Sequence, residues 1–122
     1  MNVRFAAPFV AIGWLAACQT MAAPEPAPAL TGKAAEGKLL ADALCSGCHA
    51  VAAGEVSPNP QAPTFPNIAN MSELTEATLA DFLRDSHNFP ERMNFEVAPE
   101  DAEALAAYMI TLRADDYKPS IQ

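Results

Sequence analysis

Five consecutive residues constrain this chain most strongly: Cys45, Ser46, Gly47, Cys48 and His49. Two cysteines at this spacing lie on one helical turn, so both thiols can add to the two vinyl groups on one edge of a porphyrin. The histidine that follows brings an imidazole under the iron. This C-x-x-C-H pattern is the signature of c-type haem attachment. We therefore predict one covalent haem c, bound through Cys45 and Cys48, with His49 as a ligand of the iron.

Two other uses of such a cysteine pair are a redox-active dithiol and half of a zinc site. A zinc site would need a second pair of ligands, but the chain has only one other cysteine, Cys18, which lies in the leader. A thioredoxin-like dithiol would be expected beside a βαβ pattern, and no strand pattern appears. Haem attachment is the favoured interpretation.

Four segments follow one another in an order that resembles small bacterial class I cytochromes c. They are the segment from Gly37 to His49, the run APTFPNIA at 62–69, MNF at 93–95 and ALAAY at 104–108. The resemblance covers about residues 32–114. It implies an all-α fold, with helices packed around one haem, and a protein that transfers single electrons between redox partners.

The same resemblance implies roles for several residues. The Pro63 carbonyl would accept the Nδ1 hydrogen of His49, which raises the basicity of a ligand. Phe65 and Ile68 would contact the haem, although ordinary core packing is the alternative for both. Met93, in the loop before the last helix, would be the second axial ligand.

Two departures from the family pattern leave the identity of the second axial ligand undecided. The residue after Met93 is Asn94, where the family usually has Pro, and the segment from His87 to Met93 is longer than expected. His87 is a rival ligand, and an open iron is the third possibility. An open or displaceable ligand would favour a haem enzyme or a small-ligand sensor over an electron carrier. Packing roles are expected for Met71 and Met109.

Helix signals place three helices in the haem domain. A Pro-rich loop over about 53–70 joins the first two, and a loop over 85–97 joins the last two. The first extends from Lys33 to Cys45 or beyond; in the resembled family its Gly37 allows a close crossing with the last helix. The second follows Thr75, a good N-cap, and the third opens at Pro99. The side chains expected to be buried on these helices are Leu40, Ala43, Leu44, Leu79, Phe82, Leu83, Leu105, Tyr108, Met109 and Leu112.

The N-terminus resembles a bacterial export signal. Residues 1–17 carry one charge, Arg4, before an apolar run too short to span a bilayer; a retained membrane helix is the alternative. The sequence LAAC at 15–18 resembles a lipobox, in which Cys18 becomes an acylated N-terminus, and the alternative is cleavage near Ala22 or Ala23. We expect a signal peptide at 1–17, an Ala/Pro-rich tether at 18–31, the haem domain at 32–114 and a tail at 115–122.

Charge limits the partners of the exported protein. The full chain carries a net charge of −8, and removal of Arg4 with the leader makes it −9. Such an acidic protein is not expected to bind nucleic acid. It should meet redox proteins with a basic docking patch on the periplasmic side of the envelope, either lipid-anchored or soluble. The acidic surface could instead serve solubility alone, and the cytochrome could be a fixed subunit of a dehydrogenase or oxidase.

Overall fold

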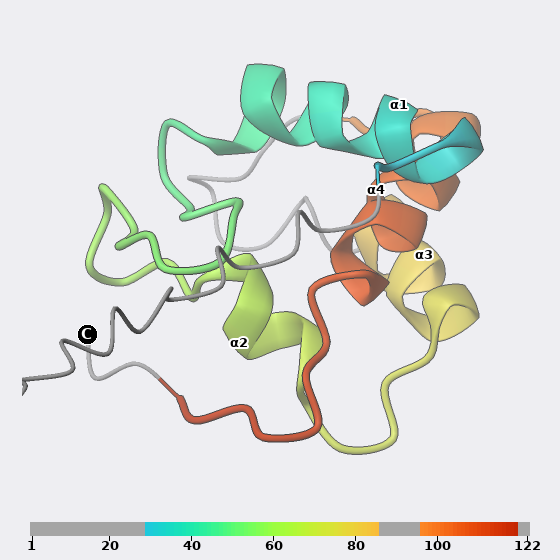
Figure 1. The fold of residues 1–122 in the computed structure, drawn as a ribbon. Helices are drawn as coiled ribbons and strands as arrows, with labels where there is room; N and C mark the ends of the chain where they lie inside the picture. The colour runs from blue at the N-terminus through green and yellow to red at the C-terminus, as the bar shows by residue number, and fades with distance from the viewer. Residues whose placement is uncertain (1–28, 86–95, 120–122) are drawn as a thin grey trace, which may run out of the picture.

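The computed structural model describes residues 29–85 and 96–119. Within these ranges the chain forms helices and no strand, so the predicted all-α class is confirmed (Figure 1). The elements are α1 (Gly32–Leu40), the π-helical turn η1 (Ala41–Cys45), α2 (Phe65–Ala69), α3 (Glu76–Asp85) and α4 (Pro99–Ile110).

The close crossing of α1 and α4 organises the fold, and Gly37 permits it. Gly37 is buried, and a Cβ atom there would lie 1.8 Å from the Ala104 carbonyl oxygen and 2.9 Å from the Tyr108 Cβ. No side chain fits at such distances. The predicted crossing at Gly37 is therefore present, and Figure 1 shows α4 passing beside α1. The Lys33–Glu103 ion pair joins the same two helices at the surface.

The first helix changes its hydrogen-bonding period before it reaches the cysteines. The Ser46 amide donates to the Ala41 carbonyl at 3.0 Å, an i to i+5 bond. Ala41 is fully buried and Leu40 partly buried, but Ala43 and Leu44 are exposed. The prediction that Ala43 and Leu44 continue the buried stripe is wrong. The wider π turn rotates them away from the face that a regular 3.6-residue period would place in the core.

Helix α3 begins where its capping signal predicts. The Thr78 amide donates to the Thr75 hydroxyl at 3.1 Å, and the Thr75 amide donates to the Thr78 hydroxyl at 2.9 Å. Leu79 and Leu83 are buried as expected, but Phe82 is 57% exposed. Helix α3 packs through the face that carries Leu79, Ala80 and Leu83, so the prediction of a buried Phe82 is wrong.

Helix α4 supplies more of the core than any other helix. It begins at Pro99, and Ala98 at the cap position makes no side-chain hydrogen bond, as the sequence indicates. The Tyr108 hydroxyl donates to the Val51 carbonyl at 2.7 Å, which ties α4 to the loop that follows the cysteines. The buried side chains of α4 are Ala102, Ala104, Leu105, Ala106, Tyr108 and Met109.

The short helix α2 interrupts a segment that the prolines predict to be a loop. The Thr64 hydroxyl accepts a hydrogen bond from the Asn67 amide at 3.1 Å, and Pro66 lies in the first turn. These are ordinary helix-start signals, but a helix of 5 residues has too few positions to show a period. Met71, just beyond α2, is 59% exposed, so the packing role predicted for it is wrong, whereas Met109 is 1% exposed.

Among the described residues, none of the helices has the length and apolar character needed to cross a membrane.

Candidate functional site

The two thiols of the C-x-x-C-H motif lie on a tight turn at the end of η1. The amides of Cys48 and His49 both donate to the Cys45 carbonyl, at 3.0 and 2.9 Å. The Ser46 hydroxyl donates to the Asp42 carbonyl at 2.6 Å and satisfies one group that the helix end leaves open. Both cysteines are free, Cys48 exposed and Cys45 partly buried. The turn thus presents two unbonded thiols three residues apart.

The electrostatics of Cys45 do not suit a redox dithiol. Burial, and secondarily the neighbouring Cys48, raise the pKa of the Cys45 thiol to about 11. Reactive dithiols instead lower the pKa of the attacking cysteine, because the thiolate is the nucleophile. Nor do the described residues include a group of three or more His, Cys, Asp or Glu side chains arranged to hold a metal ion.

The imidazole of His49 is held by one backbone acceptor. Its Nδ1 atom lies 2.7 Å from the Pro63 carbonyl oxygen. Because a carbonyl can only accept, Nδ1 carries the hydrogen, which leaves Nε2 as the nitrogen that can bind a metal. The hydrogen bond expected from the family resemblance is therefore present, and it leaves His49 in the tautomer that can bind a metal through Nε2.

The loop between His49 and α2 is folded so that it returns Pro63 to the imidazole. The Phe65 amide donates to the Ala50 carbonyl at 2.9 Å, and the Ala50 amide donates to the buried Ser57 hydroxyl at 3.0 Å. The Asn59 amide donates to the Cys48 carbonyl at 3.1 Å. Nothing in the loop sequence distinguishes Ser57 from an exposed turn residue, so sequence reasoning misses its part in this arrangement.

Phe65 and Ile68 are placed by α2. Phe65 is 4% exposed, and its ring centroid lies 5.6 Å from that of His49 at a tilt of 50°. Ile68 is partly buried against the same core. Phe65 therefore packs beside the imidazole as a core residue. Met93 and His87, the two candidates for the second axial ligand, lie outside the described residues.

This donor set fits a covalently bound haem c. Two free thiols lie on one turn, as thioether formation requires, and the adjacent imidazole has a free Nε2. Cys45 and Cys48 would hold the porphyrin edge and His49 would bind the iron, with its ring orientation fixed by Pro63.

Comparisons with known proteins agree with this reading of the site. A family model described as cytochrome c oxidase, cbb3-type, subunit III matches residues 32–109. The chain is 34% identical over 85 residues to cytochrome c-552 of Bradyrhizobium diazoefficiens, a match that covers 70% of this chain and 80% of that protein. No solved structure matches. Because the family match spans more than half of the sequence, the chain belongs to this family of c-type cytochromes, as a small all-α class I cytochrome c with one covalent haem c that carries electrons.

Proposed function

We propose that this cytochrome relays single electrons between envelope redox proteins through a haem iron bound by His49 and Met93. The observation that carries the proposal is the 2.7 Å contact between His49 Nδ1 and the Pro63 carbonyl oxygen. It holds the imidazole in one orientation and one tautomer, beside two thiols that can fix the porphyrin. When bound, the haem supplies the one-electron Fe(III)/Fe(II) couple.

Met93 suits the second axial position because a thioether opposite an imidazole raises the reduction potential. Ligands that stay in place in both oxidation states keep the rearrangement small, which is what a carrier needs. A haem enzyme or sensor would instead open the site by moving Met93 away. Asn94 in place of the usual proline removes one backbone constraint from the loop, so the possibility of a displaceable Met93 is worth a direct test.

The test compares Met93→Ala with His87→Ala as its matched control. Met93→Ala should abolish the weak near-infrared sulfur-to-iron band, lower the potential and allow carbon monoxide to bind. His87→Ala should leave the band and the potential in place. The reverse pattern would make His87 the ligand, and carbon monoxide binding to the unmodified protein would favour the sensor or enzyme.

We further propose that the mature protein is exported and anchored through a lipid on Cys18. The support is the order of an apolar leader, the small residues of LAAC at 15–18 and the Ala/Pro-rich tether. More than one acyl chain makes such anchoring stable. The haem protein should then sediment with membranes, resist high salt and dissolve in detergent. A mature N-terminus at Ala22 or Ala23, without an acyl mass, would leave a soluble periplasmic cytochrome.

A fixed place in an oxidase is the second candidate, because the matching family is named for an oxidase subunit. The name of the relative, cytochrome c-552, mentions no oxidase. Purification in mild detergent separates the two. A bound subunit would elute with partner subunits at both low and high salt, whereas an individual carrier would elute alone.

A further inference from the structure

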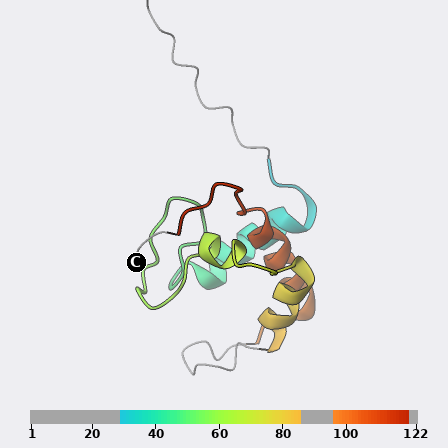
Figure 2. The ribbon, with the colours of Figure 1, turned by 90° about the horizontal axis from the view of Figure 1, so that it is seen from below.

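The C-terminal segment, residues 111–118, lies along α2 rather than extending away from the domain. Figures 1 and 2 show it leaving α4 and turning back beside α2 and the loop over 46–63. The guanidinium of Arg113 donates through Nε to the Ala69 carbonyl at 2.7 Å and also donates to the Leu74 carbonyl. One side chain thus holds both the last residue of α2 and the turn before α3.

Two asparagines of α2 and its cap complete this attachment. The Asn70 amide group donates to the Leu112 carbonyl at 3.3 Å, and its oxygen accepts from the Ala114 amide at 3.1 Å. The Tyr117 hydroxyl pairs with the Asn67 side-chain oxygen. Asn67, Ala69 and Asn70 are therefore all bound to residues that follow α4.

The N-terminal end of α2 leads directly to the imidazole of His49. Thr64 caps the helix, and the preceding residue is Pro63, whose carbonyl receives the His49 Nδ1 hydrogen. Phe65, the first residue of α2, is fixed to the Ala50 carbonyl and packs beside the His49 ring. A displacement of α2 would move Pro63 relative to His49, since only Thr64 separates Pro63 from the helix.

We propose that Arg113 and Tyr117 are positioning residues for His49: they fix α2 against the C-terminal segment and so set the strength of the His49–Pro63 hydrogen bond. Both residues lie beyond the stretch 32–109 that the family model matches. The inference rests on the proposed function through the role of His49 as ligand. A stronger hydrogen bond at Nδ1 makes an imidazole more basic, which favours Fe(III) and lowers the potential.

The experiment uses the purified holoprotein and three variants. Arg113→Ala removes both contacts to α2 and its following turn, and Tyr117→Phe removes only the hydroxyl that reaches Asn67. Thr111→Ala is the matched control, because Thr111 belongs to the same segment but its hydroxyl donates to the Tyr108 carbonyl of α4, at 2.6 Å, and not to α2. The readouts are the midpoint potential, the solvent exchange rate of the His49 Nδ1 proton by NMR, and the denaturation midpoint.

Arg113→Ala should raise the potential and speed the exchange of the Nδ1 proton by about tenfold or more, since charge-assisted hydrogen bonds are lost. Tyr117→Phe should raise the potential and the exchange rate by smaller amounts. Thr111→Ala should leave the potential and the exchange rate unchanged. A lower denaturation midpoint in Arg113→Ala, without a change in potential or exchange, would overturn the proposal by showing a purely structural role.

The wild-type NMR spectrum keeps this inference separate from the proposed function. Paramagnetically shifted His49 ring protons in the oxidised protein would establish His49 as the ligand before any variant is compared. Their absence would refute the proposed ligation and, with it, the positioning role. Their presence, combined with unchanged Arg113→Ala readouts, would refute the positioning role alone.

Discussion

At the scale of single residues, the two thiols that would attach the haem have different local environments. Cys48 is exposed and Cys45 is partly buried, with its pKa raised to about 11 by burial and by Cys48. A thiol with so high a pKa is mostly protonated at neutral pH and resists oxidation.

The attachment itself is tested by the paired change of Cys45 and Cys48 to Ser. The variant should be recovered without covalent haem, and its chain should lose its fold, because about 100 residues form a thin core without the apolar bulk of the porphyrin. Far-ultraviolet circular dichroism and staining for covalent haem measure the two losses. Extraction of haem from the unmodified protein by acid–acetone would contradict the covalent bond.

Tyr108 gives a second prediction at this scale. Burial, with smaller contributions from Asp42 and Glu55, raises its pKa from 10.0 to about 12. The folded protein therefore favours the neutral phenol. The stability that the neutral Tyr108 phenol contributes is complete below pH 10 and is lost as the pH rises from 10 to about 12. A phenolate absorbance titration should show a late component that disappears in Tyr108→Phe.

The same variant should lower the free energy of unfolding at neutral pH by about 1–3 kcal/mol, because the Val51 carbonyl loses its buried donor. Chemical denaturation measures the change. If the late titration component persists in Tyr108→Phe, the assignment to Tyr108 is wrong.

At the scale of elements, the crossing of α1 and α4 leads to the clearest stability prediction. Gly37→Ala places a methyl group 1.8 Å from the Ala104 carbonyl oxygen, so the helices must separate. Overpacking costs about 1–3 kcal/mol and sometimes more, and the better helix propensity of Ala returns only about 1 kcal/mol. We expect net destabilisation, measured by the denaturation midpoint. The control Glu36→Ala, at an exposed position on α1, should change stability by less than about 0.5 kcal/mol.

The elements also show how far local sequence signals reach. The Thr75 cap, the Pro99 start and the buried Leu79 follow from short-range rules, and the structure confirms each one. The exposure of Phe82 and of Leu44 does not follow from such rules, for two different reasons. The exposure of Phe82 depends on which face of α3 packs against α4. The exposure of Leu44 depends on one wide turn of backbone, η1. Neither choice is encoded in the spacing of apolar residues.

The candidate site likewise combines residues that the sequence predicts with contacts that it does not. The C-x-x-C-H motif predicts the thiols and the imidazole because their spacing along the chain is the spacing that the chemistry needs. The contact between His49 and Pro63 spans 14 residues, so only family resemblance could suggest it. The Arg113 contact with Ala69 spans 44 residues, and no sequence pattern predicts it.

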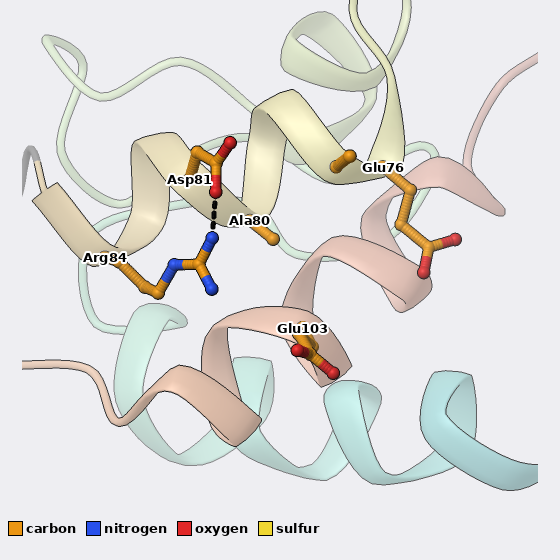
Figure 3. A pocket seen from close by; sticks show the side chains of 6 residues that line it. Glu76, Ala80, Asp81, Arg84 and Glu103 are labelled. Carbon is orange, nitrogen blue, oxygen red and sulfur yellow. Dashed lines mark hydrogen bonds and ion pairs between the residues drawn. The ribbon is translucent and has the colours of Figure 1, made fainter.

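At the scale of the whole molecule, negative charge is spread widely, including over a groove of about 370 Å³ between α3 and α4. Glu76, Asp81 and Glu103 lie around this groove, and Figure 3 shows Arg84 paired with Asp81 inside it. Glu103 in turn pairs with Lys33. Two of the three carboxylates therefore have cationic partners, so the groove is a weak centre of attraction. Any steering of a partner should come from the summed charge of the surface.

That summed charge leads to a prediction about ionic strength. With a net charge of −8, which becomes −9 if the proposed leader is removed, the protein should attract a partner whose docking site is basic. Salt screens such attraction over about 10 Å at roughly 0.1 M, so the bimolecular electron-transfer rate should fall as salt is added. Stopped-flow mixing with a basic redox partner measures this, and an acidic partner is the control, whose rate should rise. Rates that do not respond to salt would mean that the acidic surface serves solubility and that docking is apolar.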